Sequence, residues 1–364
     1  MGITQKEIAK HLGVSYMTVS RVLNNSNVYV SDHLRKKILD YAEEMGYEPH
    51  RASQVLVRNK KRHIAIFSST LPTYFWEEIN KGVQIAATQI KPFDYTVRYH
   101  QVPELDTEAY LALIKQELKQ GVDAIGLVNQ RMYDMDRIIA LITEAQIPYI
   151  FFNVDSPTNN RLCYVGSDYR DGGRLAANFI AVTLQLSPNK EVLVLQATES
   201  KLQSSRAPDI NKLRLEGFME LVTTKHSNIS VHVEFFDSLQ QDTETFTQIH
   251  EIIQRYHQKV SAIYLIPAFN TEFLRALKEI PKSNIITILH DLDSTASSHL
   301  KSGELSAVID QSPTLQGYYT VMTLEKLLER GSEHILSFVK VDHNLVLNEN
   351  RQLIHGLIEG QFLI

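Results

Sequence analysis

The sequence has a single cysteine and no long apolar run. With Cys163 as the only cysteine among 364 residues, an intrachain disulfide and a zinc site built from cysteines are excluded. No stretch of about 18 apolar residues occurs, so we expect no membrane-spanning helix. The N-terminus lacks a cationic segment followed by an apolar one, so we expect no secretory signal. These absences favour a cytoplasmic protein without a membrane partner.

The motifs of common enzyme classes are missing as well. The chain has no G-x-S-x-G elbow, no phosphate-binding P-loop, no G-x-G-x-x-G fingerprint and no H-E-x-x-H pair. The fourteen histidines are scattered, and the pair His250 and His257 is more typical of a solvated helix surface than of a metal site. We therefore predict a protein that is not an enzyme and that uses no metal and no cofactor.

Residues 4 to 23 carry the pattern of two short helices joined by a tight turn. Thr4 and Glu7 have the spacing of a capping box, and Gly13 ends the first helix before Ser15 caps the second. The apolar residues of both helices form an inward face, and the outward face of the second helix carries Tyr16, Met17, Ser20 and Arg21. A helix-turn-helix needs this division, because one face packs while the other enters the major groove of DNA. The alternative is a small helical bundle without a role in DNA binding.

A third helix is predicted between its cap at Ser31 and its end at Gly46. Its core stripe consists of apolar residues at helical spacing: Leu34, Ile38, Tyr41, Ala42 and Met45. Residues 1–62 hold 11 of the 37 Lys/Arg and 6 of the 42 Asp/Glu, a balance of +5, against −10 for the remainder. A basic head on an acidic body suits attraction to the phosphates of nucleic acid.

Beyond a basic linker at 58–62, strand-like and helix-like segments alternate. Strands are expected near 63–68, 95–101, 122–128, 148–153, 162–166, 191–196, 229–236, 260–266, 284–289, 305–309 and 337–347. Helices are expected near 75–90, 106–120, 134–145, 169–184, 211–223, 243–257, 271–279 and 312–330. This rhythm predicts an α/β body with parallel, doubly wound sheets. About eleven strands are too many for one comfortable sheet, so we expect two Rossmann-like subdomains.

Ligands of open parallel sheets bind beyond the carboxyl ends of the strands, so the residues after each expected strand are candidates for a ligand site. Together with one early helix residue they supply two aromatic rings, two carboxylates, a guanidinium and an amide: Phe75, Trp76, Asp155, Asp291, Arg214 and Gln311. This set suits a sugar, whose C–H face packs on an aromatic ring while its hydroxyls bond to polar groups. Taken singly, each residue is as well explained by core packing or helix capping.

The N-terminal segment resembles the DNA-binding domain of the LacI/GalR family of bacterial regulators. The run from Val14 to Asn24, VSYMTVSRVLN, is close to the core signature of that family. The resemblance implies that Tyr16, Met17 and Arg21 read bases. It also implies that the other DNA-binding residues of this segment mostly position the helix on the backbone: Thr4, Ser15, Thr18, Ser20 and Asn24.

The same resemblance implies a hinge helix at about 51–57 that orders on operator DNA, with Arg51, Ser53 and Gln54 at the interface. Leu56 matches the leucine wedge that enters the minor groove, where the cost of unstacking is offset by contacts to the bent duplex. His50 and Ser53 depart from the commonest hinge pattern, which has asparagine and alanine there.

Residues 63 to 347 look like the ribose-type periplasmic sugar-binding fold that these regulators carry as a sensor. The matching segments are Phe75-Trp76 with Gly82, Asp155, Ser167-Asp168 with Gly173, Arg214-x-Glu216-Gly217-Phe218, Asp291, and Asp310-Gln311-Ser312-Pro313 with Gly317. The resemblance implies that Phe75 or Trp76 stacks on the sugar and that Asp155, Arg214, Asp291 and Gln311 bond its hydroxyls. Ser156 and Pro267 depart from the pattern, which has an arginine and an Asn-Asp pair there, so the sugar is not identified.

The predicted organisation is a helix-turn-helix domain with its hinge at 1–57, a linker at 58–62, and an effector-binding and dimerisation domain at 63–364. The predicted function is transcriptional regulation, as a repressor, by a homodimer on a near-palindromic operator under the control of a small sugar. Whether the sugar releases or promotes DNA binding stays open. A sugar-binding protein of transport or chemotaxis is the alternative. A carbohydrate-acting enzyme that uses Asp155 and Asp291 is disfavoured, because paired carboxylates in sugar sites mostly bind hydroxyls.

Overall fold

The computed structural model describes residues 3–23, 30–47, 61–103, 105–130, 132–156, 161–198, 208–237, 242–267, 270–279 and 284–352. The chain divides into two compact units, Met1–Arg62 with Ile90–Thr96 and His63–Gln89 with Val97–Ile364, and each is considered by itself. The predictions for Asn24 and for the hinge residues Arg51, Ser53, Gln54 and Leu56 lie outside the described residues. In the part described, no helix is both long and apolar enough to cross a membrane.

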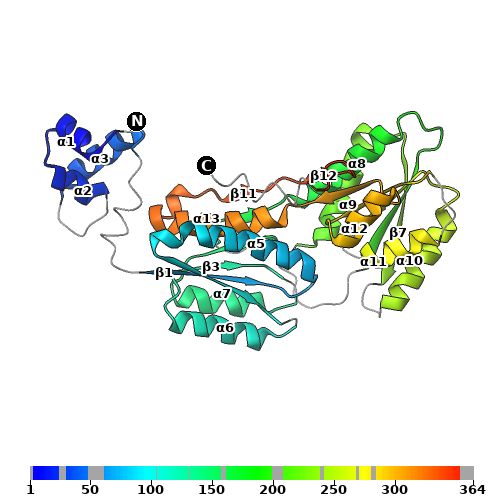
Figure 1. The fold of residues 1–364 in the computed structure, drawn as a ribbon, viewed down its shortest axis with the longest axis horizontal. Helices are drawn as coiled ribbons and strands as arrows, with labels where there is room; N and C mark the ends of the chain where they lie inside the picture. The colour runs from blue at the N-terminus through cyan, green and yellow to red at the C-terminus, as the bar shows by residue number, and fades with distance from the viewer. Residues whose placement is uncertain are drawn as a thin grey trace. The chain divides into compact units, whose positions relative to one another are not determined.

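The N-terminal bundle consists of α1 (Gln5–Leu12), α2 (Tyr16–Leu23) and α3 (Asp32–Glu44), as Figure 1 shows. The predicted capping box is confirmed, since the Glu7 N–H donates to Thr4 Oγ1 over 3.3 Å and the Thr4 N–H donates to Glu7 Oε2 over 2.8 Å. Gly13 adopts the left-handed conformation, with φ of 65°, that ends α1 and lets the chain turn into α2. The Ser15 side chain then caps α2 by accepting the Thr18 N–H at 3.0 Å.

The core of this bundle is formed by buried residues from all three helices: Ile8, Ala9, Val19, Val22, Ile38 and Ala42. Two predictions about α3 were wrong. Ser31 stands at the N-cap but makes no side-chain capping bond. Met45 is 46% exposed rather than part of the core stripe, because α3 ends at Glu44 and the chain turns away at that point.

The body contains two six-stranded sheets within the described residues, in the orders β11-β5-β4-β3-β1-β2 and β12-β10-β9-β8-β6-β7. We call the parts built on them the first lobe and the second lobe. The strands of the first sheet are β1 (Arg62–Ser68), β2 (Tyr95–Gln101), β3 (Ala124–Leu127), β4 (Tyr149–Phe152), β5 (Tyr164–Gly166) and β11 (Phe338–Lys340). Those of the second are β6 (Glu191–Thr198), β7 (Ser230–Asp237), β8 (Ala262–Leu265), β9 (Ile286–His290), β10 (Ala307–Asp310) and β12 (Asn344–Val346).

In the first lobe, helices cover both faces of the sheet (Figure 1). They are α5 (Thr73–Ile90) and α13 (Pro313–Arg330) on one face and α6 (Thr107–Lys119) and α7 (Met135–Glu144) on the other, with 3-10 turns at Lys91–Phe93 and Ser332–His334. Alternate residues of β1 explain this layering, since Phe67 packs with the α6 and α7 core whereas Ile66 lies toward α13.

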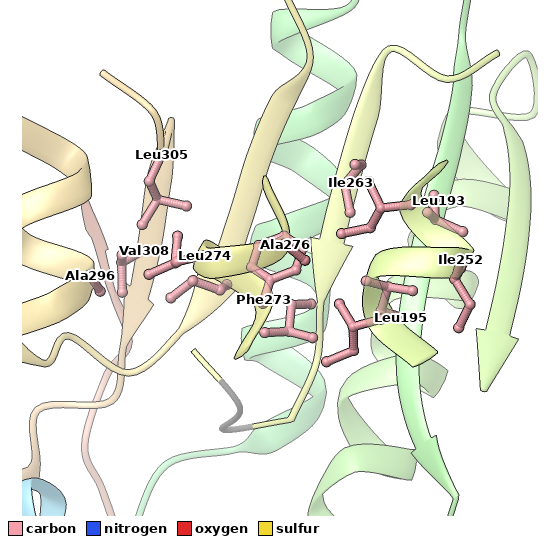
Figure 2. Packing of buried hydrophobic residues seen from close by; sticks show 14 of the residues in the cluster. Leu193, Leu195, Ile252, Ile263, Phe273, Leu274, Ala276, Ala296, Leu305 and Val308 are labelled. Atoms are coloured by element: carbon pink, nitrogen blue, oxygen red, sulfur yellow. The ribbon is translucent and has the colours of Figure 1, made fainter. Parts of the chain in front are cut away.

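In the second lobe, the helices are α8 (Tyr169–Thr183), α9 (Ile210–Lys225), α10 (Asp242–Tyr256), α11 (Asn270–Lys278) and α12 (Ser294–Ser302). The apolar cluster drawn in Figure 2 joins the sheet to α10, α11 and α12 through residues such as Leu195, Ile252, Phe273 and Ala296. A second cluster packs the other sheet face against α8 and α9. The prediction of two doubly wound α/β subdomains is thus confirmed.

Two sequence predictions fail in this region. Residues 294–302 carry no predicted helix because the segment STASSHLKS is short and polar, yet α12 forms there, capped by Asp293 and packed on the core through Ala296 and Leu300. The single strand expected at 337–347 is two strands. Strand β11 pairs in parallel with β5 of the first sheet, and β12 pairs antiparallel with β10 of the second.

The chain passes between the two sheets three times: from β5 to α8, from β10 to α13, and from β11 to β12. Strands that pair in parallel end at the same edge of their sheet, as β1 and β3, β9 and β10, and β6 and β8 do. The polar residues described next come from these carboxyl ends and from the three crossovers.

Candidate functional site

A close crossing of α8 and α9 positions the central arginine of the site. A Cβ atom at Gly173 would lie 1.9 Å from the carbonyl oxygen of Arg214, and one at Gly217 would lie 2.0 Å from that of Arg170. The two helices therefore touch backbone to backbone, which only glycine permits. This contact fixes the backbone of α9 at Arg214.

Arg214 is 1% exposed and only partly satisfied by its neighbours. Its Nη1 donates to the carbonyl oxygen of Ile266 over 3.0 Å, and its guanidinium lies 5.5 Å from the ring centre of Tyr169. The Nη2 atom is 3.9 Å from Asp291 Oδ2, longer than a hydrogen bond. Among the residues that the structure describes, neither Nε nor Nη2 has a hydrogen-bond partner, although both are buried. Buried donors without partners are costly, so this side of the guanidinium is arranged to meet a ligand or water.

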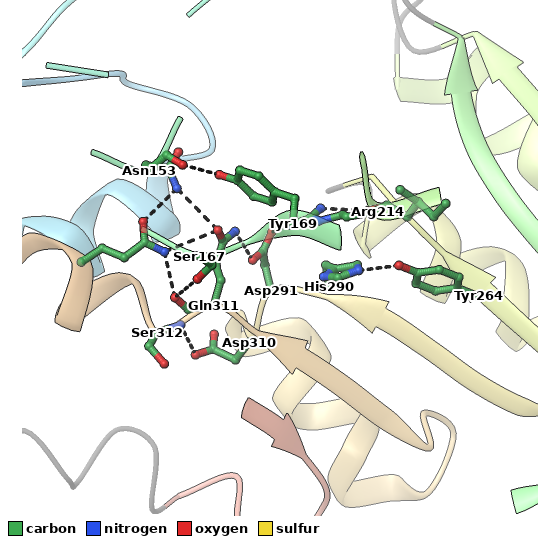
Figure 3. A network of polar contacts seen from close by, with 12 residues as sticks. Asn153, Ser167, Tyr169, Arg214, Tyr264, His290, Asp291, Asp310, Gln311 and Ser312 are labelled. Atoms are coloured by element: carbon green, nitrogen blue, oxygen red, sulfur yellow. Dashed lines mark hydrogen bonds and ion pairs between the residues drawn. The ribbon is translucent and has the colours of Figure 1, made fainter. Parts of the chain in front are cut away.

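A chain of amides connects this arginine and its carboxylate to the first lobe (Figure 3). Gln311 Nε2 donates to Asp291 Oδ1 over 2.7 Å, and Gln316 Nε2 donates to the backbone oxygen of Gln311 over 2.8 Å. Asn153 Nδ2 donates to Gln316 Oε1 over 3.1 Å. The hydroxyl of Tyr169, in turn, donates to the backbone oxygen of Asn153 over 2.6 Å. Residues from both lobes thus share one buried polar network.

The backbone at this network is strained in three places. Asn153, Asp291 and Ser312 have positive φ values of 59°, 68° and 52°, in the left-handed region. Asparagine and aspartate tolerate that region, but it still costs free energy relative to glycine, and such residues gather at binding sites where the fold holds them in place. All three residues follow a strand closely, at the point where the chain turns at the carboxyl edge of the sheet.

Burial sets the protonation of the titratable groups here. It raises the pKa of Asp310 to about 7, with nearby Asp291 adding to the shift, and raises the pKa of Asp291 despite the Arg214 charge. Burial lowers the pKa of His343 to about 3 and that of His290 well below its usual value. The histidines are therefore neutral, and a hydrogen bond of 2.6 Å joins His290 Nε2 to the hydroxyl of Tyr264. Arg214 is the one fixed cation among these groups.

The aromatic residues expected to stack on a sugar are packed inside the first lobe. Phe75 and Trp76 are 5% and 3% exposed, and their rings meet edge to face with centroids 5.2 Å apart. The Trp76 indole N–H donates to the backbone oxygen of Leu71 over 2.8 Å, and its ring also contacts Phe152. This arrangement leaves neither ring an exposed face and corresponds to core packing.

Asp155 is also differently engaged than the sequence suggests. Both of its carboxylate oxygens accept from Arg161, with Nη2 to Oδ2 at 2.7 Å, and Oδ1 accepts the Ser156 N–H at 2.7 Å. Of the six candidate effector residues, the structure therefore brings together Arg214, Asp291 and Gln311. Asp155 forms an ion pair of its own.

Sequence reasoning did not select Asn153, Asp310 or Tyr169 as site residues. Asn153 and Asp310 end or follow expected strands; the strand-end rule reached Asp310, but Gln311 was preferred beside it. The environment of Tyr169 depends on the packing of α8 and gives no pattern in the sequence.

The candidate base-reading residues of α2 lie on the surface of the N-terminal bundle. Tyr16 and Met17 are 47% and 56% exposed, and Arg21 is exposed as well. Ser20 is half-buried, so it points outward less than its position suggests. Ser15 and Thr18 bond to one another through their hydroxyls over 2.8 Å, and Thr4 bonds to Glu7.

Comparison with known proteins agrees with both parts of the structure. Residues 64–333 match the family model of a periplasmic binding protein domain, and residues 4–50 match that of the bacterial regulatory proteins of the lacI family. The chain carries a lacI-family regulatory domain followed by a periplasmic-binding-protein domain. Its body is a periplasmic-binding-protein domain of the two-lobed α/β type.

Relatives of this LacI-family protein are transcription regulators. The probable HTH-type transcriptional repressor ExuR of Bacillus subtilis (strain 168) is 24% identical over 287 residues, covering 76% of this chain and 78% of that protein. The lactose operon repressor of Escherichia coli (strain K12) is 22% identical over 284 residues, covering 78% and 72%. The structure of AraP, an arabinose binding protein from Geobacillus stearothermophilus, shares the fold with a TM-score of 0.68 at 17% identity, over 81% of this chain and 99% of AraP.

Proposed function

We propose that this LacI-family regulator is a repressor of carbohydrate-metabolism genes whose body binds a small sugar through Arg214, Asp291 and Gln311. The observation that carries the proposal is the buried Arg214, whose Nε and Nη2 have no hydrogen-bond partner among the described residues. Nε and Nη2 lie on one edge of the guanidinium, so they can donate to two adjacent oxygens of one ligand. Asp291 and Gln311 place a carboxylate and an amide beside it.

A neutral polyhydroxyl ligand suits this site better than an anion. Arg214 is accompanied by two buried carboxyl groups, Asp291 and Asp310, whose own pKa values are raised by burial. A ligand that carries a full negative charge would be repelled by Asp291 and Asp310 in their charged forms. Ligand hydroxyls, in contrast, can donate to a carboxylate and accept from the guanidinium. The names of several relatives, among them a ribose operon repressor of Halalkalibacterium halodurans, support a sugar.

DNA binding is assigned to the N-terminal bundle, with Tyr16, Met17 and Arg21 as base readers on the exposed face of α2. The proposed backbone contacts are Thr4, Ser15, Thr18, Ser20 and Asn24, and the proposed hinge contacts are Arg51, Ser53, Gln54 and Leu56. One such helix covers few base pairs, so we propose a homodimer on a near-palindromic operator, with the domain boundaries at 57 and 63. The transport-protein alternative accounts for the body alone.

A gel-shift titration tests the proposal. The full-length protein is mixed with DNA from the region upstream of its own gene, with and without D-ribose, L-arabinose, D-galactose or D-glucose. We expect a specific complex whose affinity changes with one of these sugars. A protein that binds the DNA no better than a scrambled duplex, or a complex indifferent to every sugar, contradicts the corresponding half of the proposal.

A further inference from the structure

Tyr169 links the guanidinium of Arg214 to the backbone of the first lobe. It is the first residue of α8, where the chain has just crossed from β5 into the second lobe. Its ring centre lies 5.5 Å from the guanidinium carbon of Arg214, and its hydroxyl donates to the backbone oxygen of Asn153 over 2.6 Å (Figure 3). The side chain is 4% exposed, so both contacts are shielded from water. One buried side chain therefore contacts a proposed ligand residue and, at its other end, the first lobe.

The acceptor of this hydrogen bond has a backbone conformation that is costly by itself. Asn153 directly follows β4 and has a φ of 59°, in the left-handed region. Its carbonyl oxygen accepts a second hydroxyl, that of Tyr164 on β5, also over 2.6 Å, and its N–H donates to the backbone oxygen of Val165 over 2.9 Å. A residue in a sparsely populated conformation persists only while its neighbours stabilise it. Of the two hydroxyls that do so here, that of Tyr169 comes from the second lobe.

The side chain of Asn153 extends the connection into the first lobe. Its Nδ2 donates to Gln316 Oε1 over 3.1 Å, and Gln316 lies on α13, which covers one face of the first sheet. The backbone oxygen of Gln316 in turn accepts the hydroxyl of Thr320 over 2.6 Å. A change in the backbone of Asn153 therefore also displaces an amide that is bonded to α13.

We propose that Tyr169 is a positioning residue for regulation, whose hydroxyl ties the backbone conformation of Asn153 in the first lobe to the position of Arg214 in the second. The inference rests on the sugar-controlled function proposed above. Tyr169 itself needs no contact with the sugar, because its hydroxyl is engaged by Asn153. A ligand that draws the guanidinium of Arg214 alters its packing on the Tyr169 ring, so the bond to Asn153 is better in one arrangement of the lobes than in another. Such a difference between two states is what allows a ligand to shift their balance.

Tyr169→Phe tests this link, since phenylalanine keeps the ring beside Arg214 and removes only the hydroxyl. Gel shifts of the full-length protein on DNA from the region upstream of its own gene give the dissociation constant without sugar and with saturating sugar. The sugar is whichever of D-ribose, L-arabinose, D-galactose and D-glucose changes this constant most in the parent. We expect the ratio of the two constants to move toward one by about 2- to 12-fold in Tyr169→Phe, the range for loss of one neutral hydrogen bond.

Tyr164→Phe is the matched control, because it loses a hydrogen bond of the same length to the same oxygen, but from within the first lobe. Urea denaturation should show a similar loss of stability in both variants, whereas the sugar response of Tyr164→Phe should stay parental. A parental response in Tyr169→Phe, or a Tyr169→Phe protein that no longer folds, shows that the bond serves stability alone and overturns the inference. An equal fall in the response of Tyr164→Phe overturns it as well, because the effect then does not depend on the link between the lobes. A parent that binds the DNA but responds to no sugar of the panel contradicts the sugar-controlled function and this inference together.

Discussion

Arg214 shows how a single side chain can be held ready for a ligand. It is anchored by one hydrogen bond to Ile266 and lies against the ring of Tyr169, so its position does not depend on a ligand. Preorganisation of this kind lowers the entropy lost on binding, because the long side chain is already ordered. In the proposed site, the Nε and Nη2 edge of the guanidinium is the part expected to give affinity and selectivity for adjacent ligand oxygens.

Trp76 is the only tryptophan in the chain, so its fluorescence reports one environment. Because the indole is 3% exposed and its N–H is bonded to Leu71, we expect a blue-shifted emission maximum and little quenching by acrylamide. Sugars should change the emission only slightly. A red-shifted maximum that a sugar quenches strongly would show instead that the ring faces the ligand.

Asp310 makes stability depend on pH in an unusual direction for a carboxyl group. Its pKa is raised from 3.8 to about 7, so the folded state holds the proton more tightly than the unfolded state. The associated stabilisation is fully present below about pH 4 and is lost as the pH rises through about 7. We expect Asp310→Asn to flatten the decline in melting temperature between pH 5 and pH 8. Glu144 is exposed, so the melting temperature of Glu144→Gln should fall with pH as that of the parent does. An equal fall in both variants would contradict the raised pKa assigned to Asp310.

At the scale of the element, two helix pairs use the same device in different lobes. Gly173 and Gly217 bring α8 against α9, while Gly82 and Gly317 bring α5 against α13, each with a hypothetical Cβ within 2.0 Å of a backbone oxygen of the opposite helix. A side chain larger than that of glycine does not fit at these crossings. Any substitution that separates the helices therefore also shifts the residues next to the crossing, such as Arg214 on α9.

The two crossings therefore give a matched pair of variants. Gly173→Ala should lower the unfolding free energy by about 1–3 kcal/mol through overpacking and should also weaken sugar binding, because the clash is with the backbone of Arg214. Gly82→Ala clashes with Thr314 at the other crossing and should cost similar stability with a smaller loss of sugar affinity. Chemical denaturation and sugar titration of both variants provide the comparison. Equal losses of affinity would show that the α8–α9 contact has no special part in placing Arg214.

The exposed face of α2 leads to a prediction about base preference. Met17→Ala and Arg21→Ala should each change the preferred half-site, with about 1–3 kcal/mol for each good base contact. Methionine forms no bidentate hydrogen bond, so its expected partner is an apolar edge such as the thymine methyl. Leu39→Ala is the control, since Leu39 is a 44% exposed apolar residue on α3 and should leave base preference unchanged. Selection from a randomised duplex library measures the preferred half-site of all three variants. If Met17→Ala and Arg21→Ala both keep the parental preference, α2 is not the helix that reads the bases.

At the scale of the whole molecule, DNA binding and ligand binding are assigned to separate units, and regulation is the free energy that couples them. A sugar alters operator affinity only if it binds one state of the body better than another. The three crossovers between the sheets are the segments that such a change must bend or rotate.

Asp291→Asn should separate the two activities. The substitution preserves the size of the side chain and an oxygen for the Gln311 donor but removes the carboxylate that accepts sugar hydroxyls. We expect operator binding without sugar to persist and the sugar response in a gel shift to require at least tenfold more sugar, or about 1.4 kcal/mol of binding free energy. A variant with the parental sugar response would exclude Asp291 from the effector site.

The sequence by itself determined the helix-turn-helix, with its capping box and its glycine turn, because these signals are local and lie within a few residues of one another. It also determined the alternating strands and helices and the division into two subdomains, since buried parallel strands are continuous apolar runs. The strand-end rule selected Asp291 and Gln311 as candidates, and the family resemblance added Arg214; their role in ligand binding stays a prediction.

Only the tertiary structure decided the rest. Residues 337–347 supply one strand to each sheet. Helix α12 forms because Ala296 and Leu300 pack into the core of the second lobe. Neither outcome follows from a local sequence pattern. Whether an aromatic ring after a strand meets a ligand or the core depends on how the next helix packs. That packing places Trp76 inside the first lobe, with its ring against Phe75 and Phe152.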